Sequence, residues 1–477
     1  MNHSIRWVSA VAGLMFFALL ANITGSYLFR GPELTNSPLN QRVLQEQFGW
    51  PRGPLMAGNT PIVESVAVDS YLWANKRVYN NGPMYAPITG YYSLNFGRSR
   101  LEQVYNAELT STSDSQLMAR VMDALAGRST QGAIVQTTIN PAAQAAAWEA
   151  MQGRKGAVVA VDYTTGALLA YVSTPSYDPA DLASSDLDHV VDAWDAYNDD
   201  PARPMADRAG REIYPPGSTF KLVTTAAALE AGWRPDTLVD SPKELPLPNS
   251  EHVLENFGQV GCGGERITML DAMKVSCNTA YANIGMALGA DALRNQAEKF
   301  GFNEGFMSDI GSATSNFPSE MDAAQTAMSA IGQFEVAATP LQMTMVAAAI
   351  ANRGVLMEPY LVSELRNPDL SVLSIHAKNP IRQALSQQSA GILASMMIEN
   401  VNSGGGDDAA MDGLTVGGKT GTAQWDTDEH PYYWFVGFVE ESHVAIGVFI
   451  EETKSGDPQW SGGAAGPVFK AVAEALR

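Results

Sequence analysis

The sequence predicts an α/β protein of the α+β type, with one antiparallel five-stranded sheet flanked by helices, an extended N-terminal module and one transmembrane helix. Strand-like apolar runs occur at 156–162 and 167–173, joined by a short turn. Helical segments fill much of 218–352, and three further strand-like runs lie within 415–450. Because strands occur at both ends of this domain, we expect the first two to pair with strands remote in the sequence.

The first residues predict a membrane anchor. Residues 7–29 carry no charge and lie between Arg6 and Arg30, which is long enough to cross a bilayer as a helix. A cleaved signal peptide is the alternative, but its apolar core would be shorter, about 7–15 residues, and would end near an Ala-x-Ala-like site. We therefore expect residues 1–6 in the cytoplasm and everything after the span on the opposite side of the membrane.

The remaining chain divides into two parts. Residues 31–140 contain mixed short elements punctuated by Gly and Pro, and we interpret them as a spacer module with interaction surfaces. An Ala-rich segment at 141–151 predicts the helix that opens the catalytic domain, 141–477. The Asp-rich segment 178–200 lacks calcium-loop spacing and predicts a solvated helix and loop. The Gly- and Asp-rich segment 401–413 predicts a flexible loop.

Composition limits the function. The 477 residues are 45% hydrophobic, which is enough for large cores. The net charge of −21 argues against nucleic-acid binding, which needs a basic surface. The six histidines have no metal-ligand spacing, so we expect neither a metal nor a cofactor.

Three short motifs follow one another along the chain: Ser218–Lys221 (S-x-x-K), Ser276–Asn278 (S-x-N) and Lys419–Gly421 (K-T-G). The first occurs once. The other two also match at Ser93–Asn95 and Lys454–Gly456. Order and context separate them, because the former precedes the first motif and the latter lies in a polar segment, whereas K-T-G opens a strand-like run.

Ser218 follows Pro215-Pro216-Gly217, and the helical segment after it ends near Gly232. Proline at a helix start and glycine past its end predict that Ser218 lies in the first turn, with Lys221 on the same face. The unpaired amides of such a turn suit an anionic tetrahedral intermediate.

A serine hydroxyl needs a base before it can attack, and Lys221 is the nearest candidate. A free lysine is mostly charged at neutral pH, but burial and a second cation such as Lys419 would lower its pKa. The alternative is that Lys221 stays protonated and only polarises the hydroxyl.

These motifs are those of penicillin-binding proteins and serine β-lactamases. Longer segments resemble class B penicillin-binding proteins, nearest to the actinobacterial penicillin-binding protein A branch: RGPL (52–55), GAVVAVDYTTGALLAYVSTPSYDP (156–179), YPPGSTFK (214–221), SCNTAYANIG (276–285), GGKTGTAQW (417–425) and YYWFVGFVE (432–440). Four positions depart from the family's usual Asp, Asn, Gly and Ala: Asn140, Asp207, Arg100 and Gly466. None of them touches a catalytic motif.

The resemblance implies a role for each motif. Ser276 relays a proton towards the leaving amine, and Asn278 binds the substrate peptide. The strand that lines the cleft contributes Lys419, Thr420, Gly421 and Thr422. The backbone amides of Ser218 and Thr422 form the oxyanion hole. The implied reaction is peptidoglycan D,D-transpeptidation through a Ser218 acyl-enzyme with release of D-Ala, and β-lactams acylate the same serine.

The expected partners are peptidoglycan stem peptides, β-lactams, the membrane, and a membrane glycosyltransferase with other cell-wall machinery. The resemblance places the catalytic domain outside the cytoplasm. A D,D-carboxypeptidase would use the same residues with water as acceptor. A β-lactam sensor would need a cytoplasmic effector or further spans, and a non-catalytic scaffold would tolerate motif loss.

The two cysteines, Cys262 and Cys277, are 15 residues apart, and the second lies inside the S-x-N motif. Outside the cytoplasm a disulfide is allowed and would hold that motif in place. Two buried free thiols are the alternative.

Overall fold

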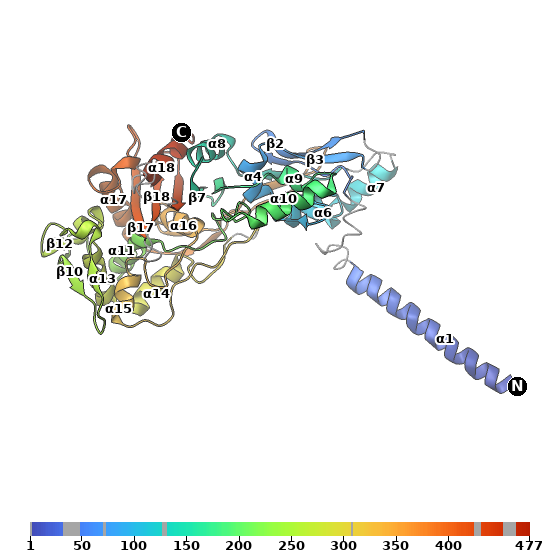
Figure 1. Ribbon diagram of the computed structural model, residues 1–477, viewed down its shortest axis with the longest axis horizontal. Coiled ribbons are helices and arrows are strands. Elements are labelled where there is room, and N and C mark those ends of the chain that lie inside the picture. Colours follow the sequence, from blue (N-terminus) through green and yellow to red (C-terminus); the bar gives the residue numbers. More distant parts are fainter. Residues whose placement is uncertain are drawn as a thin grey trace.

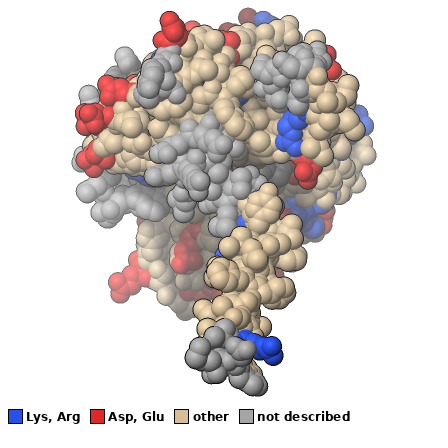
Figure 2. Space-filling model, turned by 90° about the vertical axis from the view of Figure 1, so that its right-hand side faces the viewer, with Lys and Arg blue, Asp and Glu red and all other residues tan. Residues whose placement is uncertain are grey.

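The computed structural model describes residues 2–31, 48–69, 73–125, 131–306, 309–423, 431–451 and 464–477. The chain begins with helix α1 (Asn2–Gly25), continued by a π-helical turn at Ser26–Arg30. Within the described residues, Arg6–Arg30 is the one helical stretch long and apolar enough to cross a membrane, and none of it is buried. In Figure 2 this helix projects as a largely uncharged column.

A six-stranded sheet forms the core of the N-terminal module, in the order β15-β14-β6-β1-β2-β3. Four strands precede residue 140: β1 (Leu55–Ala57), β2 (Thr60–Ala67), β3 (Asn75–Tyr79) and β6 (Ile134–Thr137). The other two are β14 (Val362–Arg366) and β15 (Val372–Ile375), and β14 pairs with β6. A hairpin from beyond residue 360 therefore completes the sheet of the N-terminal module.

Short helices cover the module: α4 (Gly82–Thr89), α5 (Arg100–Val104), α6 (Asn106–Leu109) and α7 (Leu117–Leu125), with a small β4–β5 hairpin at Tyr92–Ser93 and Gly97–Arg98. In α5, the buried carboxylate of Glu102 accepts hydrogen bonds of 2.6 Å from Arg52 and Arg77. Burial alone would raise the pKa of Glu102, but the two guanidiniums outweigh it and lower that pKa. Removing either arginine would leave charge uncompensated in the core.

The second sheet has the predicted five antiparallel strands, in the order β17-β18-β19-β7-β8. Its first two strands in the sequence are β7 (Lys155–Asp162) and β8 (Leu168–Thr174). The remaining strands are β17 (Val416–Ala423), β18 (Tyr432–Val439) and β19 (Val444–Glu451). The prediction that strands remote in sequence would pair is confirmed, since β7 pairs with β19 along its whole length.

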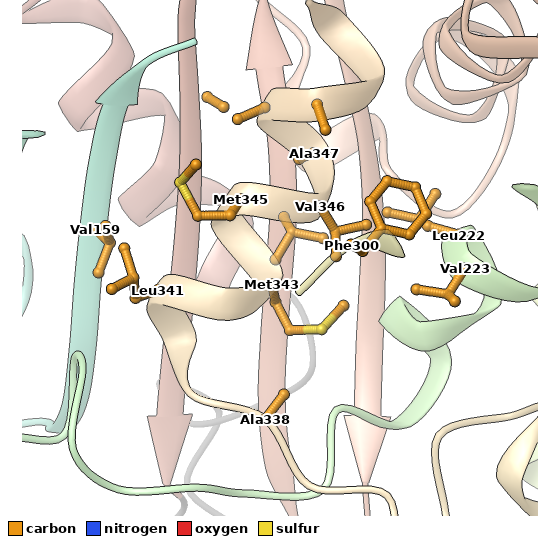
Figure 3. Close-up of a cluster of buried hydrophobic side chains, with 14 of the residues drawn as sticks. Val159, Leu222, Val223, Phe300, Ala338, Leu341, Met343, Met345, Val346 and Ala347 are labelled. Carbon is orange, nitrogen blue, oxygen red and sulfur yellow. The ribbon is translucent and has the colours of Figure 1, made fainter. Parts of the chain in front are cut away.

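Helices cover both faces of this sheet. Helix α16 (Pro340–Ala351) lies against one face, with almost every side chain buried (Figure 3). Helices α8 (Pro141–Ala150) and α18 (Ala465–Glu474) pack together in a second apolar cluster with the other face (Figure 1). Because both faces are covered, the central strands are apolar at consecutive positions rather than alternating.

The segments between the strands are mainly helical: α9 (Pro179–Leu182), α10 (Leu187–Asp199), α11 (Lys221–Glu230), α12 (Met269–Lys274), α13 (Asn278–Leu288), α14 (Ala290–Lys299), α15 (Ala323–Ser329) and α17 (Gln387–Ser403). Three two-stranded ribbons complete the domain: β9–β12 (Leu238–Asp240, Arg266–Thr268), β10–β11 (Glu244–Pro246, Val253–Glu255) and β13–β16 (Val355–Met357, Pro380–Gln383). The expected loop at 401–413 is shorter than predicted, because α17 continues to Ser403 and a 3-10 turn occupies Asp407–Ala409.

Candidate active site

The first motif begins in a 3-10 turn, Gly217–Phe220, rather than in the first turn of an α-helix. Helix α11 begins at Lys221, one turn after Ser218. The turn is held between two close neighbours. Gly217 has a φ of 51°, and a Cβ atom on it would lie 2.8 Å from the carbonyl oxygen of Thr422 in β17. A Cβ atom on Gly332 would lie 2.2 Å from the carbonyl oxygen of Gly217, so both glycines are required by the close approach.

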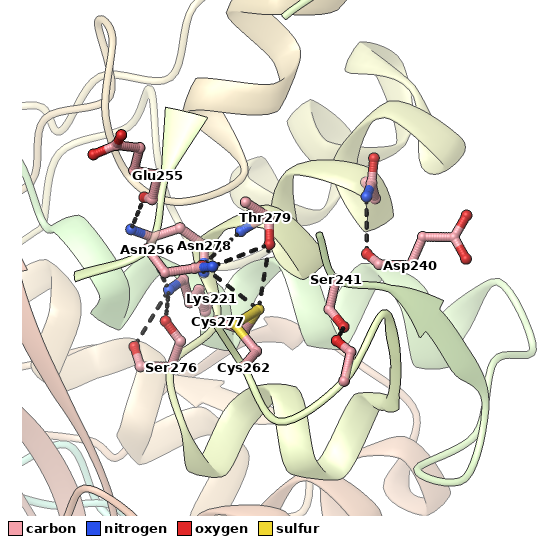
Figure 4. Close-up of a disulfide and its surroundings, with 12 residues drawn as sticks. Lys221, Asp240, Ser241, Glu255, Asn256, Cys262, Ser276, Cys277, Asn278 and Thr279 are labelled. Atoms are coloured by element: carbon pink, nitrogen blue, oxygen red, sulfur yellow. Dashed lines mark hydrogen bonds between the residues drawn. A yellow bond between two sulfur atoms is a disulfide. The ribbon is translucent and has the colours of Figure 1, made fainter. Parts of the chain in front are cut away.

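The three motifs meet around Ser276. Lys221 Nζ donates to the backbone carbonyl of Ser276 at 2.6 Å, to Asn278 Oδ1 at 2.8 Å and to Ser276 Oγ at 3.3 Å. Lys419 Nζ donates to the same Ser276 Oγ at 2.9 Å and to the carbonyl of Thr420 at 3.0 Å. Figure 4 shows Lys221 between Ser276 and Asn278. One hydroxyl therefore lies between two lysine side chains.

Both lysines are fully buried. Burial, and after it the charge of Lys419, lower the pKa of Lys221 well below its ordinary value. Burial lowers the pKa of Lys419 to about 7. Two adjacent ammonium groups in a desolvated site repel each other, so this arrangement favours one neutral amine, at Lys221.

Ser276 has a φ of 54°, an uncommon conformation for a residue with a side chain. It follows the end of α12 and precedes α13, and its amide donates to the carbonyl of Met273. The sharp corner between these helices presents both the carbonyl and the hydroxyl of Ser276 to Lys221. The backbone geometry, and not only the side chain, therefore builds this site.

The K-T-G strand, β17, is an edge strand that lies next to the 3-10 turn. Thr420 and Thr422 alternate with buried neighbours and remain half-buried, so their side chains lie along the rim. Trp434 of β18 donates from Nε1 to the carbonyl of Pro215 at 3.1 Å, which ties the sheet to the segment before Ser218. Asn400 of α17 donates to the carbonyl of Gly418 in β17 at 2.8 Å.

Cys262 and Cys277 form a disulfide in the structure (Figure 4). Both are buried, at 8% and 1% exposure. The bridge attaches the segment that follows the β10–β11 ribbon to the S-x-N motif. No local sequence pattern marks Asn256, Asn400 or Trp434, because each contacts its motif from more than about fifteen positions away in the chain.

The alternative motif matches differ in their setting. Ser93 ends the short strand β4 and is buried in the N-terminal module. Lys454–Gly456 lies outside the described residues. Across the part of the chain that the structure describes, no group of three or more His, Cys, Asp or Glu side chains could hold a metal ion.

Comparison with known proteins agrees with this geometry. Residues 156–474 match the penicillin binding protein transpeptidase domain. The chain belongs to the class B penicillin-binding proteins. Residues 52–135 of this penicillin-binding protein match the penicillin binding protein A dimerisation domain, which lies inside the predicted N-terminal module.

Similar proteins cover almost the whole chain. The peptidoglycan D,D-transpeptidase PbpA of Mycolicibacterium smegmatis is 41% identical, and the match covers 100% of this chain and 99% of the relative. The crystal structure of PBPA from Mycobacterium tuberculosis superposes with a TM-score of 0.86 at 39% identity, covering 90% of this chain and 99% of that one. An imipenem acyl-enzyme complex of the same protein has a TM-score of 0.86 at 38% identity, with the same coverage.

The departures from the family pattern have physical explanations in this penicillin-binding protein. Asn140 caps α8 by accepting from the amides of Ala142 and Ala143, as an aspartate would. Arg100 has a φ of 51° and forms a largely buried ion pair of 3.0 Å with Asp207, so two of the departures are partners.

The fourth departure, Gly466, has a packing reason. A Cβ atom there would lie 2.7 Å from the Cβ atom of Asp408.

Proposed function

We propose that Ser218 is the acylated nucleophile of a peptidoglycan D,D-transpeptidase, with Lys221 as its base. The observation that carries the proposal is the convergence of two buried lysines on Ser276. One of them, Lys221, lies one turn after Ser218. A neutral Lys221 has two N–H groups, which the carbonyl of Ser276 and Asn278 Oδ1 accept. Its lone pair is then free to take a hydroxyl proton.

The proton leaves through Ser276. In the acylation step, Ser218 Oγ attacks the carbonyl carbon of the penultimate D-Ala and gives its proton to Lys221. Ser276 passes a proton from Lys221 to the amine of the terminal D-Ala as the peptide C–N bond breaks. Lys419 donates to Ser276 Oγ and so holds that oxygen in place, 3.3 Å from Lys221 Nζ. An amine from a neighbouring stem then attacks the ester, and Ser218 recovers its proton.

The rim of β17 provides substrate binding in this proposal. The amides of Ser218 and Thr422 bind the developing oxyanion, which the close approach of the 3-10 turn to β17 supports. The half-buried hydroxyls of Thr420 and Thr422 suit the terminal carboxylate of the donor stem, with Gly421 between them. Asn278 binds the stem's peptide backbone.

The location is also part of the proposal. We infer one membrane span at residues 7–29, with residues 1–6 in the cytoplasm and the catalytic domain outside it. The disulfide supports this topology, since disulfides persist in oxidising compartments. A membrane glycosyltransferase is the proposed partner of the N-terminal module, whose helix α7 exposes Met118, Met122 and Leu125.

Labelling with a fluorescent penicillin tests the assignment. The Ser218→Ala protein should remain folded and lose all covalent label, and the labelled peptide of the native protein should contain Ser218. A label retained by the variant, or found on another peptide, would refute the assignment. Product analysis with a stem-peptide donor and an amine acceptor then separates transpeptidation from hydrolysis, which a D,D-carboxypeptidase would favour.

A further inference from the structure

Helix α13, which begins at Asn278 of the S-x-N motif, lacks a cap from its own sequence. Cys277 occupies the cap position, and its side chain makes the disulfide instead. The cap comes from Asn256, more than twenty residues earlier. Asn256 Oδ1 accepts from the amide of Asn278 at 2.8 Å and from that of Thr279 at 3.2 Å. These are the unpaired amides that a helix start leaves open.

The same segment sets the orientation of the Asn278 side chain. Asn278 Nδ2 donates to the carbonyl of Glu255 at 3.1 Å, while its Oδ1 accepts from Lys221 at 2.8 Å. Turning this amide over would place its NH2 group against the Lys221 amine and its oxygen against the Glu255 carbonyl. The carbonyl of Glu255 therefore determines that Lys221 meets an acceptor at this point, while Asn256 holds the backbone of Asn278.

The segment is itself held firmly. It follows the β10–β11 ribbon directly, and the disulfide at Cys262 joins the chain beyond it to the motif. Asn256 is 7% exposed, and its Nδ2 also donates to Thr279 Oγ1 at 3.4 Å. Figure 4 shows Asn256 beside Asn278, close to the disulfide. Its contacts leave its side chain one orientation.

We propose that Asn256 is a positioning residue for acylation, which holds Asn278 and, through it, the base Lys221 in their reactive geometry. This rests on the proposed function. Asn256 hydrogen-bonds to the start of α13 and acts through it. Its amide is also uncharged, so it caps the helix without placing a negative charge beside a lysine that must lose its proton.

The charged and titratable groups around Lys221 are few. Lys419 approaches from β17 through Ser276, and the ring of Tyr281 in α13 lies 5.4 Å from Lys221 Nζ. Burial raises the pKa of Tyr281, so that phenol stays neutral. The carboxylate of Glu255 belongs to an exposed residue. A carboxylate at position 256 would be a new buried charge in this set and would raise the pKa of Lys221.

Two variants of the full-length protein test the proposal. Asn256→Asp keeps an oxygen that can cap both amides, so it should fold normally. Because acylation needs neutral Lys221, its rising pH limb should move upward by about half a unit or more. Asn256→Ala loses the cap and should acylate about tenfold more slowly in its folded fraction. Asn283→Asp is the matched control. It adds the same charge to α13, at a position whose side chain donates to the backbone carbonyl of Asp240 and not to the active-site motifs.

The measurement is the rate constant for acylation by fluorescent penicillin as a function of pH, with thermal melting of each protein. A purely structural role would lower the melting temperature of Asn256→Ala but leave the acylation rate of its folded fraction unchanged, and that result would overturn the proposal. An unmoved pH limb in Asn256→Asp would also overturn it, because position 256 would then lie too far from Lys221 to hold it. An equal shift in Asn283→Asp would do the same. If Asn256→Ala fails to fold, the pH limb of Asn256→Asp decides. Label that survives in Ser218→Ala would instead refute the proposed function.

Discussion

The position of Lys419 predicts how the pH dependence of acylation responds when its charge is removed. Lys221 Nζ lies 3.3 Å and Lys419 Nζ 2.9 Å from Ser276 Oγ, so the two nitrogens are at most about 6 Å apart. At an effective dielectric constant of about 20, two unit charges at about 6 Å repel by ~2.8 kcal/mol, or about two pKa units. Replacing Lys419 with Met should therefore raise the pKa of Lys221 by about two units.

The assay is the second-order rate constant for labelling by a fluorescent penicillin across the acidic and alkaline range. The rate rises as pH passes through the pKa of Lys221, because the neutral amine is the base. In Lys419→Met this rising limb should move upward by about two units, whatever the loss in maximal rate. In Lys419→Arg the limb should stay, because arginine keeps the cation. In the native protein the labelling rate should decline again as Lys419 loses its proton, near its pKa of about 7. In Lys419→Arg this decline should disappear, because arginine stays protonated.

Two results would refute this reasoning. One is a rising limb in Lys419→Met that stays within about half a unit of the native one, since the charge would then have no effect on Lys221. The other is an equal shift in the Met and Arg variants, which would trace the effect to packing. Circular dichroism of each variant checks that the comparison is between folded proteins.

Three further predictions concern the same site. Lys221→Arg should lower acylation by orders of magnitude, because arginine cannot supply a neutral amine, whereas Lys419→Arg should lose less; equal losses would remove the support for Lys221 as base. Joint replacement of Cys262 and Cys277 by Ser should lower the free energy of unfolding by about 3 kcal/mol on the chain-entropy model, which is about 4–5 °C in melting temperature for a domain of this size. Intact-mass analysis after alkylation in denaturant checks that the native protein has no free thiol. Gly217→Ala should abolish most labelling in a folded protein, because its Cβ would collide with a carbonyl of β17 at a positive φ, and native rates would count against the close approach.

Much of the architecture follows from local composition. The apolar run at 7–29 predicts a long apolar helix. The strand pair at 156–173 and the three C-terminal strand runs report burial through their own residues, so the five-stranded sheet was predictable as well. The motifs at Ser218, Ser276 and Lys419 were found for the same reason, since each is a short pattern of residue types.

The contacts between the two modules were not predictable, because hydrophobic periodicity reports that a side chain is buried and not what buries it. The sheet of the N-terminal module takes β14 and β15 from beyond residue 360. Arg100 and Asp207 compensate each other from different modules. Composition therefore could not show that residues from beyond 140 complete and contact the N-terminal module.

The sequence by itself determined the apolar N-terminal helix, the strands and the chemical groups of the site. Only the tertiary structure decided how those groups act: that Lys221 and Lys419 share the hydroxyl of Ser276, and that Asn256 caps the helix carrying Asn278. The physical reason is that pKa values and side-chain orientations depend on distances of a few ångströms between residues far apart in the chain. Those distances exist only after the chain has folded.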